Sequence, residues 1–197
     1  MSGFEHHRKS DRIIATFTGF EADLLRSLAS QMVELLRNER AEPAAPTADA
    51  FDALMTEFSG ATSPPEDPVL ARLFPTAYPD DDEAASDFRR FTESSLRDGK
   101  AAASGTVIDT LEDAGLPPEL DQEGLVIDVE LTRSEAETWM RAFTDIRLAL
   151  ATRLEVEAGD EDYWHSLPDD DPRAQAHDIY EWVGYLQETV VEALTAR

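Results

Sequence analysis

The stretch Thr132 to Leu154, TRSEAETWMRAFTDIRLALATRL, predicts one long amphipathic helix. Thr132 and Glu135 form a Thr-x-x-Glu start signal, in which the threonine oxygen accepts a hydrogen bond from a free backbone amide and the glutamate reaches back to the threonine amide. At about 1.5 Å per residue, the helix is expected to run about 35 Å and to cross a small domain. Its apolar residues recur at three-to-four-residue spacing, which places them on one stripe: Trp139, Met140, Phe143, Ile146, Leu150 and Leu154.

A second segment near the N-terminus repeats this pattern. Residues 12–17 and 125–131 both read as strands, and each is followed by a Thr-x-x-Glu box and a long helix. When Thr18 is aligned with Thr132, Glu21 falls on Glu135, and Leu25 falls one position from Met140. Two helices that start in the same favourable way would give this likeness, and so would two equivalent units whose strands pair. A lone strand cannot satisfy its own backbone groups, so each strand needs a partner.

The chain as a whole is predicted to form a single mainly α domain. Residues 1–10 are expected to be a flexible tail, and residues 11–197 are expected to hold about six or seven helices with one small two-stranded sheet, 12–17 and 125–131. Loops are predicted near 40–48, 59–67 and 156–171, where proline, glycine or acidic residues gather. The remaining helices are predicted at 18–40, 51–58, 69–74, 83–97, around 107–111, and from Pro172 to the C-terminus. Gly99 is expected to kink or end the helix before it.

The charge of the chain restricts its partners. Its 197 residues carry 42 acidic and 17 basic side chains, for a formal net charge of −25. That charge argues against direct binding to a nucleic-acid backbone or to an anionic membrane surface. It favours a basic protein partner, or simply high solubility. The N-terminus has no apolar signal core and no run is long enough to span a bilayer, so a cytoplasmic location is expected.

No arrangement of residues points to catalysis, a metal or a cofactor. The chain has no cysteine, which excludes disulfides, thiolate catalysis and cysteine-ligated zinc. There is no Gly-x-Ser-x-Gly elbow, phosphate-binding glycine loop or His-Glu-x-x-His motif. The four histidines are expected to be inert: His6 and His7 lie in the expected tail, His165 lies in an acidic loop that matches no metal motif, and His177 is expected to be exposed. The chain is therefore predicted not to be an enzyme.

Aromatic side chains on the central and last helices are expected to fill the core. They recur at helical spacing, and such stripes are more often core than ligand pocket; they are Trp139, Phe143, Trp182 and Tyr185.

Charged residues among apolar neighbours suggest a partly buried charge network that ties helices together. Asp145 and Arg147 flank the core residue Ile146, and arginine can bind a carboxylate through two bonds. The alternative is a set of surface pairs, each worth less than about 1 kcal/mol. The candidate network consists of Asp145, Arg147, Arg153, Arg72 and Arg89.

Several segments together resemble an actinobacterial family long catalogued as a domain of unknown function, which includes the oxidative stress regulator AosR. They are Arg12 to Leu36, Asp67 to Tyr78, Asp87 to Thr92, Leu96 to Lys100, Trp139 to Leu154, and Tyr180 to Trp182 with Leu186 and Gln187. The resemblance implies a non-enzymatic regulator of stress-responsive transcription that works with a sigma factor and senses oxidation through an N-terminal cysteine pair. Since this chain has no cysteine, a thiol switch cannot operate in it.

Three classes of function follow for the structure to address. The leading hypothesis is a regulator that binds a basic protein such as a sigma factor. The alternative is a structural or adaptor homodimer linked to Clp-type proteolysis, which the resemblance suggests because the family's genes tend to lie near that of a Clp-protease adaptor. A small-molecule or enzymatic function would need a cavity that gathers His165, Asp145 or several arginines.

Overall fold

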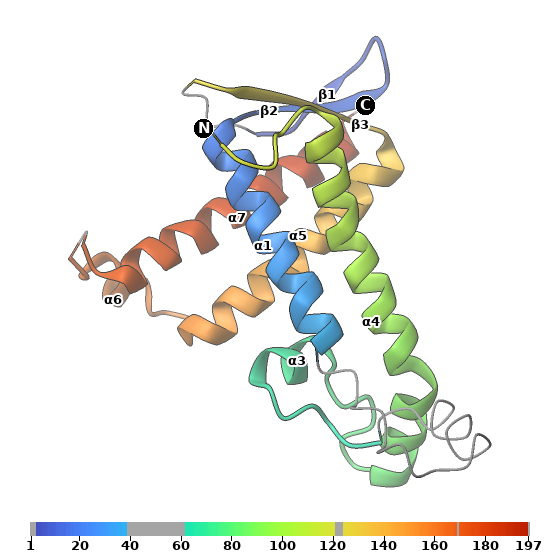
Figure 1. The fold of residues 1–197 in the computed structure, drawn as a ribbon. Helices are drawn as coiled ribbons and strands as arrows, with labels where there is room; N and C mark the ends of the chain where they lie inside the picture. Colours follow the sequence, from blue (N-terminus) through green and yellow to red (C-terminus); the bar gives the residue numbers. More distant parts are fainter. Residues whose placement is uncertain (1–2, 39–61, 121–123, 169, 197) are drawn as a thin grey trace.

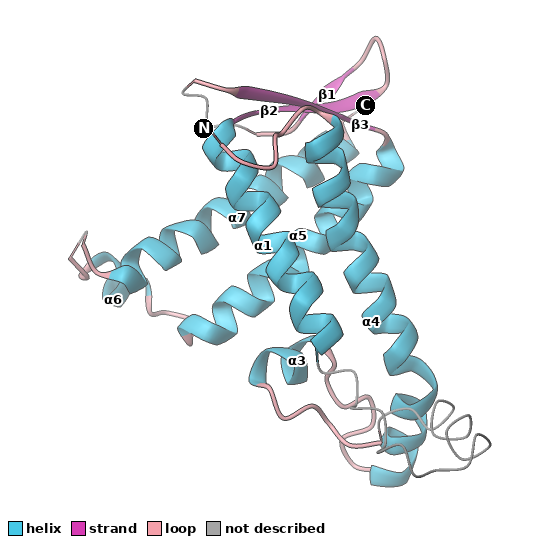
Figure 2. Ribbon diagram, in the orientation of Figure 1, coloured by secondary structure: helices cyan, strands magenta, loops and turns pink. Residues whose placement is uncertain are grey.

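The computed structural model describes residues 3–38, 62–120, 124–168 and 170–196 (Figure 1). Its elements, in order, are β1 (Glu5–His7), β2 (Arg12–Thr18), α1 (Gly19–Asn38), α3 (Pro68–Leu73), α4 (Asp82–Asp113), β3 (Val126–Leu131), α5 (Arg133–Leu154), α6 (Glu161–His165) and α7 (Pro172–Thr195). The chain is mainly α, as predicted, and the small sheet lies across one end of the helices (Figure 2). The helix predicted at 51–58 lies outside the described residues. None of the helices in the described ranges combines the length and the apolarity that crossing a bilayer requires.

The sheet has three antiparallel strands in the order β1-β2-β3. The predicted pairing of residues 12–17 with 125–131 is confirmed, with Ala15 opposite Val129. The predicted flexible tail needs correction, because β1 lies within it and pairs with β2. The physical reason is Phe4, which is 4% exposed and whose ring packs edge-on against Trp139 at 5.5 Å between centroids. One buried aromatic side chain therefore holds this short strand on the core.

The chain contains two halves of the same construction. The first half runs β2–α1–α3–α4 and the second runs β3–α5–α6–α7. The first long helix of each half packs mainly on the last helix of the same half, α1 on α4 and α5 on α7. Among the described residues, each half therefore contains a strand, a long helix, a short helix and another long helix in the same order.

The two halves also share a series of buried apolar positions. The shift that carries Thr18 onto Thr132 aligns the buried positions of the strands, Ile13, Ala15 and Phe17 with Ile127, Val129 and Leu131. It also aligns those of the helices, Ala22, Leu25, Ala29 and Met32 with Ala136, Trp139, Phe143 and Ile146. Leu25 thus corresponds to Trp139, in agreement with the sequence alignment that sets Thr18 on Thr132.

The pairing of β2 with β3 places equivalent residues of the two halves opposite each other. Ala15 and Val129 lie directly opposite each other in the sheet, and they are also equivalent positions of the two halves. Because the strands are antiparallel, every other pair follows from this one; Ile13 faces Leu131, which is the equivalent of Phe17. The hypothesis of two equivalent units with paired strands is therefore confirmed.

Both halves use the predicted helix start. In α5, the Thr132 hydroxyl accepts from the Glu135 amide at 3.2 Å, and Glu135 Oε2 accepts from the Thr132 amide at 2.7 Å. In α1, the same two bonds join Thr18 and Glu21 at 3.2 and 2.8 Å. These bonds satisfy backbone amides that have no partner inside the helix.

Helix α4 is longer than expected. The segments 83–97 and 107–111 belong to one continuous helix of 32 residues, and Gly99 lies inside it. A Cβ at Gly99 would meet no other atom within 4 Å, so this glycine faces open space. A single exposed glycine costs a helix about 1 kcal/mol relative to alanine and does not have to end it.

Candidate functional site

The structure divides the five predicted network residues among separate contacts. Asp145 is bound by Lys100 of α4, with 2.6 Å between Nζ and Oδ1, and its side chain is only 6% exposed. Arg147 lies two residues further along α5, where a helical side chain faces away from Asp145. It contacts α7 instead. The two residues that flank Ile146 therefore join α5 to different helices, and they do not bind each other.

A row of buried and half-buried charged side chains runs along α4, which we call the α4 ladder: Arg89, Glu93, Arg97 and Lys100. Glu93 is 4% exposed and accepts from Arg89 at 2.6 Å and from Arg97 at 2.7 and 2.9 Å. Arg89 also donates to the carbonyl oxygen of Phe74 at 3.2 Å, just after α3. The Arg97 guanidinium and the Lys100 ammonium both lie over the Phe74 ring.

The ladder places positive charge inside an acidic protein. Its three cations face two carboxylates, Glu93 and Asp145, so the group carries a formal charge of +1. Burying an ion costs several kcal/mol unless partners satisfy it, and here Glu93 has two arginine partners. The α4 ladder can hold α3, α4 and α5 in register, and its contacts stabilise the packing of these helices.

Arg147 forms a polar seam between α5 and α7. It donates to Gln187 Oε1 at 3.0 Å, and its guanidinium carbon lies 5.2 Å from the centre of the Tyr180 ring. Gln187 in turn donates to the Thr144 hydroxyl at 2.6 Å. A Cβ at Gly184 would lie 3.2 Å from the Arg147 guanidinium. The glycine therefore provides the space in which the arginine lies flat on α7.

Arg153 joins the end of α5 to the start of α3. Its Nη2 donates to Asp67 Oδ2 at 2.7 Å, while Asp67 Oδ1 accepts from the Val69 and Leu70 amides as the helix cap. Burial acts to raise the pKa of Asp67, but the bond from Arg153 and the two backbone amides together hold that pKa below its ordinary value. Arg72 is exposed at the end of α3 and makes no hydrogen bond to the other described residues.

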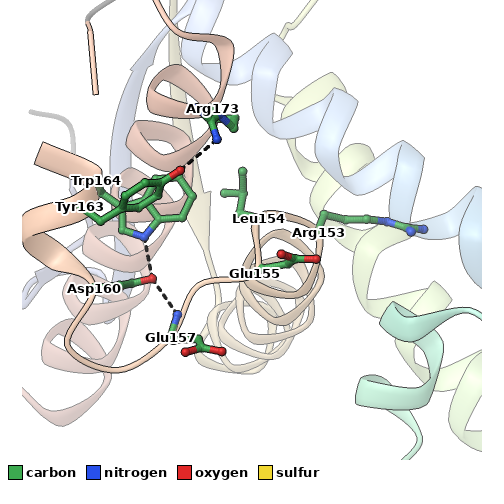
Figure 3. A pocket seen from close by; sticks show the side chains of 8 residues that line it. All are labelled: Arg153, Leu154, Glu155, Glu157, Asp160, Tyr163, Trp164 and Arg173. Carbon is green, nitrogen blue, oxygen red and sulfur yellow. Dashed lines mark hydrogen bonds between the residues drawn. The ribbon is translucent and has the colours of Figure 1, made fainter. Parts of the chain in front are cut away.

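A cavity of about 400 Å³ opens between the end of α5, the α5–α6 connection, α6 and the start of α7 (Figure 3). Two of its side chains are tied to each other, since Arg173 donates to the Tyr163 hydroxyl at 2.9 Å. Asp160 accepts from the Trp164 indole and from the Glu157 amide, each at 2.8 Å. The cavity is lined by Arg153, Leu154, Glu155, Glu157, Asp160, Tyr163, Trp164 and Arg173. It gathers two arginines, but neither His165 nor Asp145, and most of its polar groups already have partners.

His177 packs against Trp164, one of the residues that line this cavity, and corrects one expectation. It was predicted to be exposed, yet it is 9% exposed and stacks on Trp164 with 4.5 Å between ring centroids. The cause is α6, whose single turn brings Trp164 back over the start of α7. Within the described ranges, histidine and acidic side chains form no group of three or more that could hold a metal ion.

Similarity to known proteins covers nearly the whole of this fold. The profile of the family described as "Domain of unknown function (DUF2017)" matches residues 1–194. The chain belongs to the DUF2017 family. A relative named "Oxidative stress regulator AosR", from Mycobacterium tuberculosis, is 31% identical over 201 residues, which is 95% of this chain and 84% of the relative. A relative from Mycobacterium leprae, named "Putative oxidative stress regulator AosR", is 35% identical over 189 residues, 89% of this chain and 79% of its own length.

No solved structure matches this DUF2017 chain. The family resemblance expected from the sequence is therefore confirmed, and the arrangement of two related halves comes from the present structure alone. Because the full sequence contains no cysteine, this chain has the family's fold without any thiol that could react.

The residues that bind the predicted charged side chains of this DUF2017 chain were not identified from the sequence. Glu93 and Arg97 had a usable signal, because Arg89, Glu93 and Arg97 follow one another at four-residue spacing, which places them on one face of a helix. Lys100 and Gln187 had no such signal, because each binds a residue more than 35 positions away in the chain.

Proposed function

We propose that this chain is a non-enzymatic regulator of stress-responsive transcription, which acts in the cytoplasm by binding a protein partner, with a sigma factor as the leading candidate. The observation that carries the proposal is its similarity, over 95% of its length, to proteins named for the regulation of oxidative stress. The sequence also contains no nucleophile elbow, phosphate-binding glycine loop or His-Glu-x-x-His motif, and Glu93 and Asp145 are each paired with basic side chains of helix α4.

Charge supports a basic partner. The formal net charge of −25 opposes binding to the phosphate backbone, so a role in transcription requires a protein that itself binds nucleic acid. Proteins of that kind carry positively charged surfaces, and complementary charge speeds their encounter with an acidic partner. The resulting complex should weaken as salt screens the attraction.

The signal that controls this regulator must be something other than thiol oxidation. Without cysteine, neither a disulfide nor a sulfenic acid can form. We therefore expect partner binding to be the same under reducing conditions and under oxidising conditions that leave methionine intact.

The test is capture of partners by the full chain from a lysate of its native host, at low and at high salt, followed by binding measurements with each purified sigma factor. We expect a sigma factor to be retained at low salt and lost at high salt. Its affinity should be unchanged by a disulfide-forming oxidant. Failure of every sigma factor of the host to bind, or binding that ignores salt, would contradict the proposal.

A structural or adaptor homodimer linked to Clp-type proteolysis is the second candidate. It is favoured by apolar side chains on the first half of α4, where Phe88 is 43% exposed and Phe91 is 74% exposed. Analytical ultracentrifugation tests this candidate, because the adaptor proposal requires the chain to sediment as a dimer. A dimer that Phe91→Asp converts to monomer would favour the adaptor.

A further inference from the structure

Strand β3 has an edge to which no main-chain hydrogen bond is made from residues 3–38, 62–120, 124–168 or 170–196. The Gly19 amide donates to the Leu125 carbonyl oxygen at 2.7 Å, which fixes the alternation of the β2–β3 ladder. By that alternation, Ile127, Val129 and Leu131 exchange hydrogen bonds with β2. The alternate residues of β3 direct their N–H and C=O groups away from β2. These residues are Val126, Asp128 and Glu130, and all three are exposed.

The equivalent edge on the other side of the sheet is closed. There, β1 pairs with β2, so that Glu5 faces Ile14 and His7 faces Arg12. The shift that relates the two halves carries Ile14 onto Asp128 and Arg12 onto Val126. The chain therefore covers one of two related edges with its own N-terminal strand, whereas no strand of the described residues pairs with the other (Figure 1).

We propose that this open edge of β3 binds an extended segment of a partner protein, in which an apolar residue and two basic residues occupy alternate positions. Strand addition of this kind takes its affinity from main-chain hydrogen bonds and its specificity from alternate side chains. The inference rests on the proposed function only in that it needs a protein partner. It adds the place and the chemistry of the contact.

The exposed side chains define the segment that fits. Asp128 accepts from the Thr16 hydroxyl at 2.7 Å, and Glu130 makes no ion pair with the described residues. A lysine or arginine opposite each acid would form a favourable cross-strand pair. Val126 is 54% exposed, and Phe20, which follows the Gly19 that binds Leu125, is 72% exposed. The start of β3 therefore favours an apolar residue in the partner.

A second copy of this chain fits the edge poorly. Antiparallel pairing of β3 with itself would set Asp128 and Glu130 against the same acids of the other copy, and like charges on facing positions destabilise a sheet. Both copies also carry a net charge of −25. Exposed charges on an edge strand prevent self-association in natural proteins, and the same acids select a basic segment.

The probe for this inference is a fluorescein-labelled peptide that alternates arginine with valine, measured by fluorescence anisotropy against the full chain. The matched peptide has the same composition with its arginines and valines in separate blocks, which keeps the charge and removes the alternation. We expect the alternating peptide to bind at least about tenfold more tightly, since only it can add as a strand with its basic residues on one face. Equal affinity for the two peptides would mean that charge alone drives binding and would overturn the inference.

Two variants of one residue separate backbone pairing from charge. Glu130→Ala removes the carboxylate and keeps the outward N–H, whereas Glu130→Pro also removes that N–H. Because this amide faces away from β2 and Val129 before it is extended, proline should leave the ladder intact. We expect the alanine variant to weaken peptide binding severalfold and the proline variant to weaken it by about tenfold more. Equal losses in two folded variants would count against strand addition.

Amide hydrogen exchange on the wild-type chain tests the inference even if the proline variant fails to fold. The amides of Ile127 and Val129 should be protected with and without the peptide. Those of Val126, Asp128 and Glu130 should exchange quickly in the free chain and slow by at least about tenfold when the peptide is bound. Unchanged exchange at saturating peptide, or protection in a dimer without peptide, would overturn the inference.

The same variants tell the two proposals apart. If a sigma factor binds wild type and Glu130→Pro equally, the edge inference fails and the regulatory proposal stands. If the peptide adds to β3 and no sigma factor binds, the regulatory proposal fails and the edge remains a site for a basic segment.

Discussion

The two halves of the molecule share a pattern of burial and differ in what fills it. Ala22 and Ala136 are equivalent and fully buried, but the next equivalent pairs set Leu25 against Trp139 and Ala29 against Phe143. The small residues of α1 permit close packing on α4, whereas the aromatic residues of α5 fill the centre beneath the sheet. The comparison shows that one start signal and one spacing can specify the same backbone around cores of different volume.

The halves also differ in how they are joined to their neighbours. In the first half, α4 carries the ionic ladder around Glu93. In the second, α7 receives Arg147 through uncharged partners, Gln187 and Tyr180. An ion pair with both members buried loses most when one member is removed, because the other charge stays desolvated. The α4 ladder should therefore be more sensitive to substitution than the contacts of Arg147 with α7.

The largest expected effect comes from the pair Trp139 and Leu25. Trp139→Ala should lower the free energy of unfolding by about 4–5 kcal/mol, because the indole packs on three rings and donates to the Thr110 hydroxyl at 3.0 Å. Leu25→Ala at the equivalent position should cost about 2–4 kcal/mol. Urea unfolding followed by circular dichroism measures both. A smaller loss at Trp139 than at Leu25 would show that α5 is not the centre of the core.

The second comparison is between the α4 ladder and the contacts of Arg147 with α7. Glu93→Ala should cost about 3–5 kcal/mol, since it leaves two buried arginines without their carboxylate. Arg147→Ala should cost about 1–2 kcal/mol, because it removes one hydrogen bond and a ring contact. Glu137→Ala on the exposed face of α5 is the matched acidic control and should change stability by less than about 0.5 kcal/mol. Equal effects at Glu93 and Glu137 would remove any role for the ladder in stability.

The helix starts differ in exposure, and pH reveals the difference. Thr132→Val should cost about 1 kcal/mol at neutral pH, and Thr18→Val somewhat less because its box is more exposed. The bonds from the Thr132 hydroxyl and amide lower the pKa of Glu135 from its ordinary value of 4.5. A carboxylate whose pKa is lowered by folding stabilises the fold at every pH above its ordinary pKa. That contribution is lost as the pH falls through the lowered pKa.

Melting temperatures measured from pH 7 down to acid therefore test this start. The wild type should lose stability below about pH 4.5, and Thr132→Val should lose less over the same range, because part of the effect is already gone. Parallel curves for the two proteins would show that Glu135 contributes nothing to the acid response.

The smallest effect is expected at Gly184. Gly184→Ala places a methyl group about 3.2 Å from the Arg147 guanidinium, which is the end of a flexible side chain and can shift. We expect a loss of about 1 kcal/mol. Gly105→Ala is the matched control, because a Cβ there meets nothing within 4 Å, and it should stabilise helix α4 slightly. A stabilised Gly184→Ala variant would contradict the flat packing of Arg147 on α7.

Much of the fold was predictable because its signals are local. A Thr-x-x-Glu box satisfies backbone groups within one turn, and helical spacing determines which side chains share a face, so α1, α5 and the β2–β3 pair were all expected. β1 was missed because three residues carry too little pattern. His177 was misplaced because its burial depends on Trp164, thirteen positions earlier, folding back through α6. The candidate charge residues were mostly identified, and their partners were not.

The sequence by itself determined the helices, their inward faces, the acidity of the chain and the absence of thiol chemistry. Each of these depends on residue type and on spacing within a few turns. The tertiary structure decided that Asp145 binds Lys100, that Phe4 holds β1 on the core, and that one edge of β3 has no partner strand among the described residues. The reason is that these contacts join segments far apart in the chain, and only the packing of the two halves brings such segments within bonding distance.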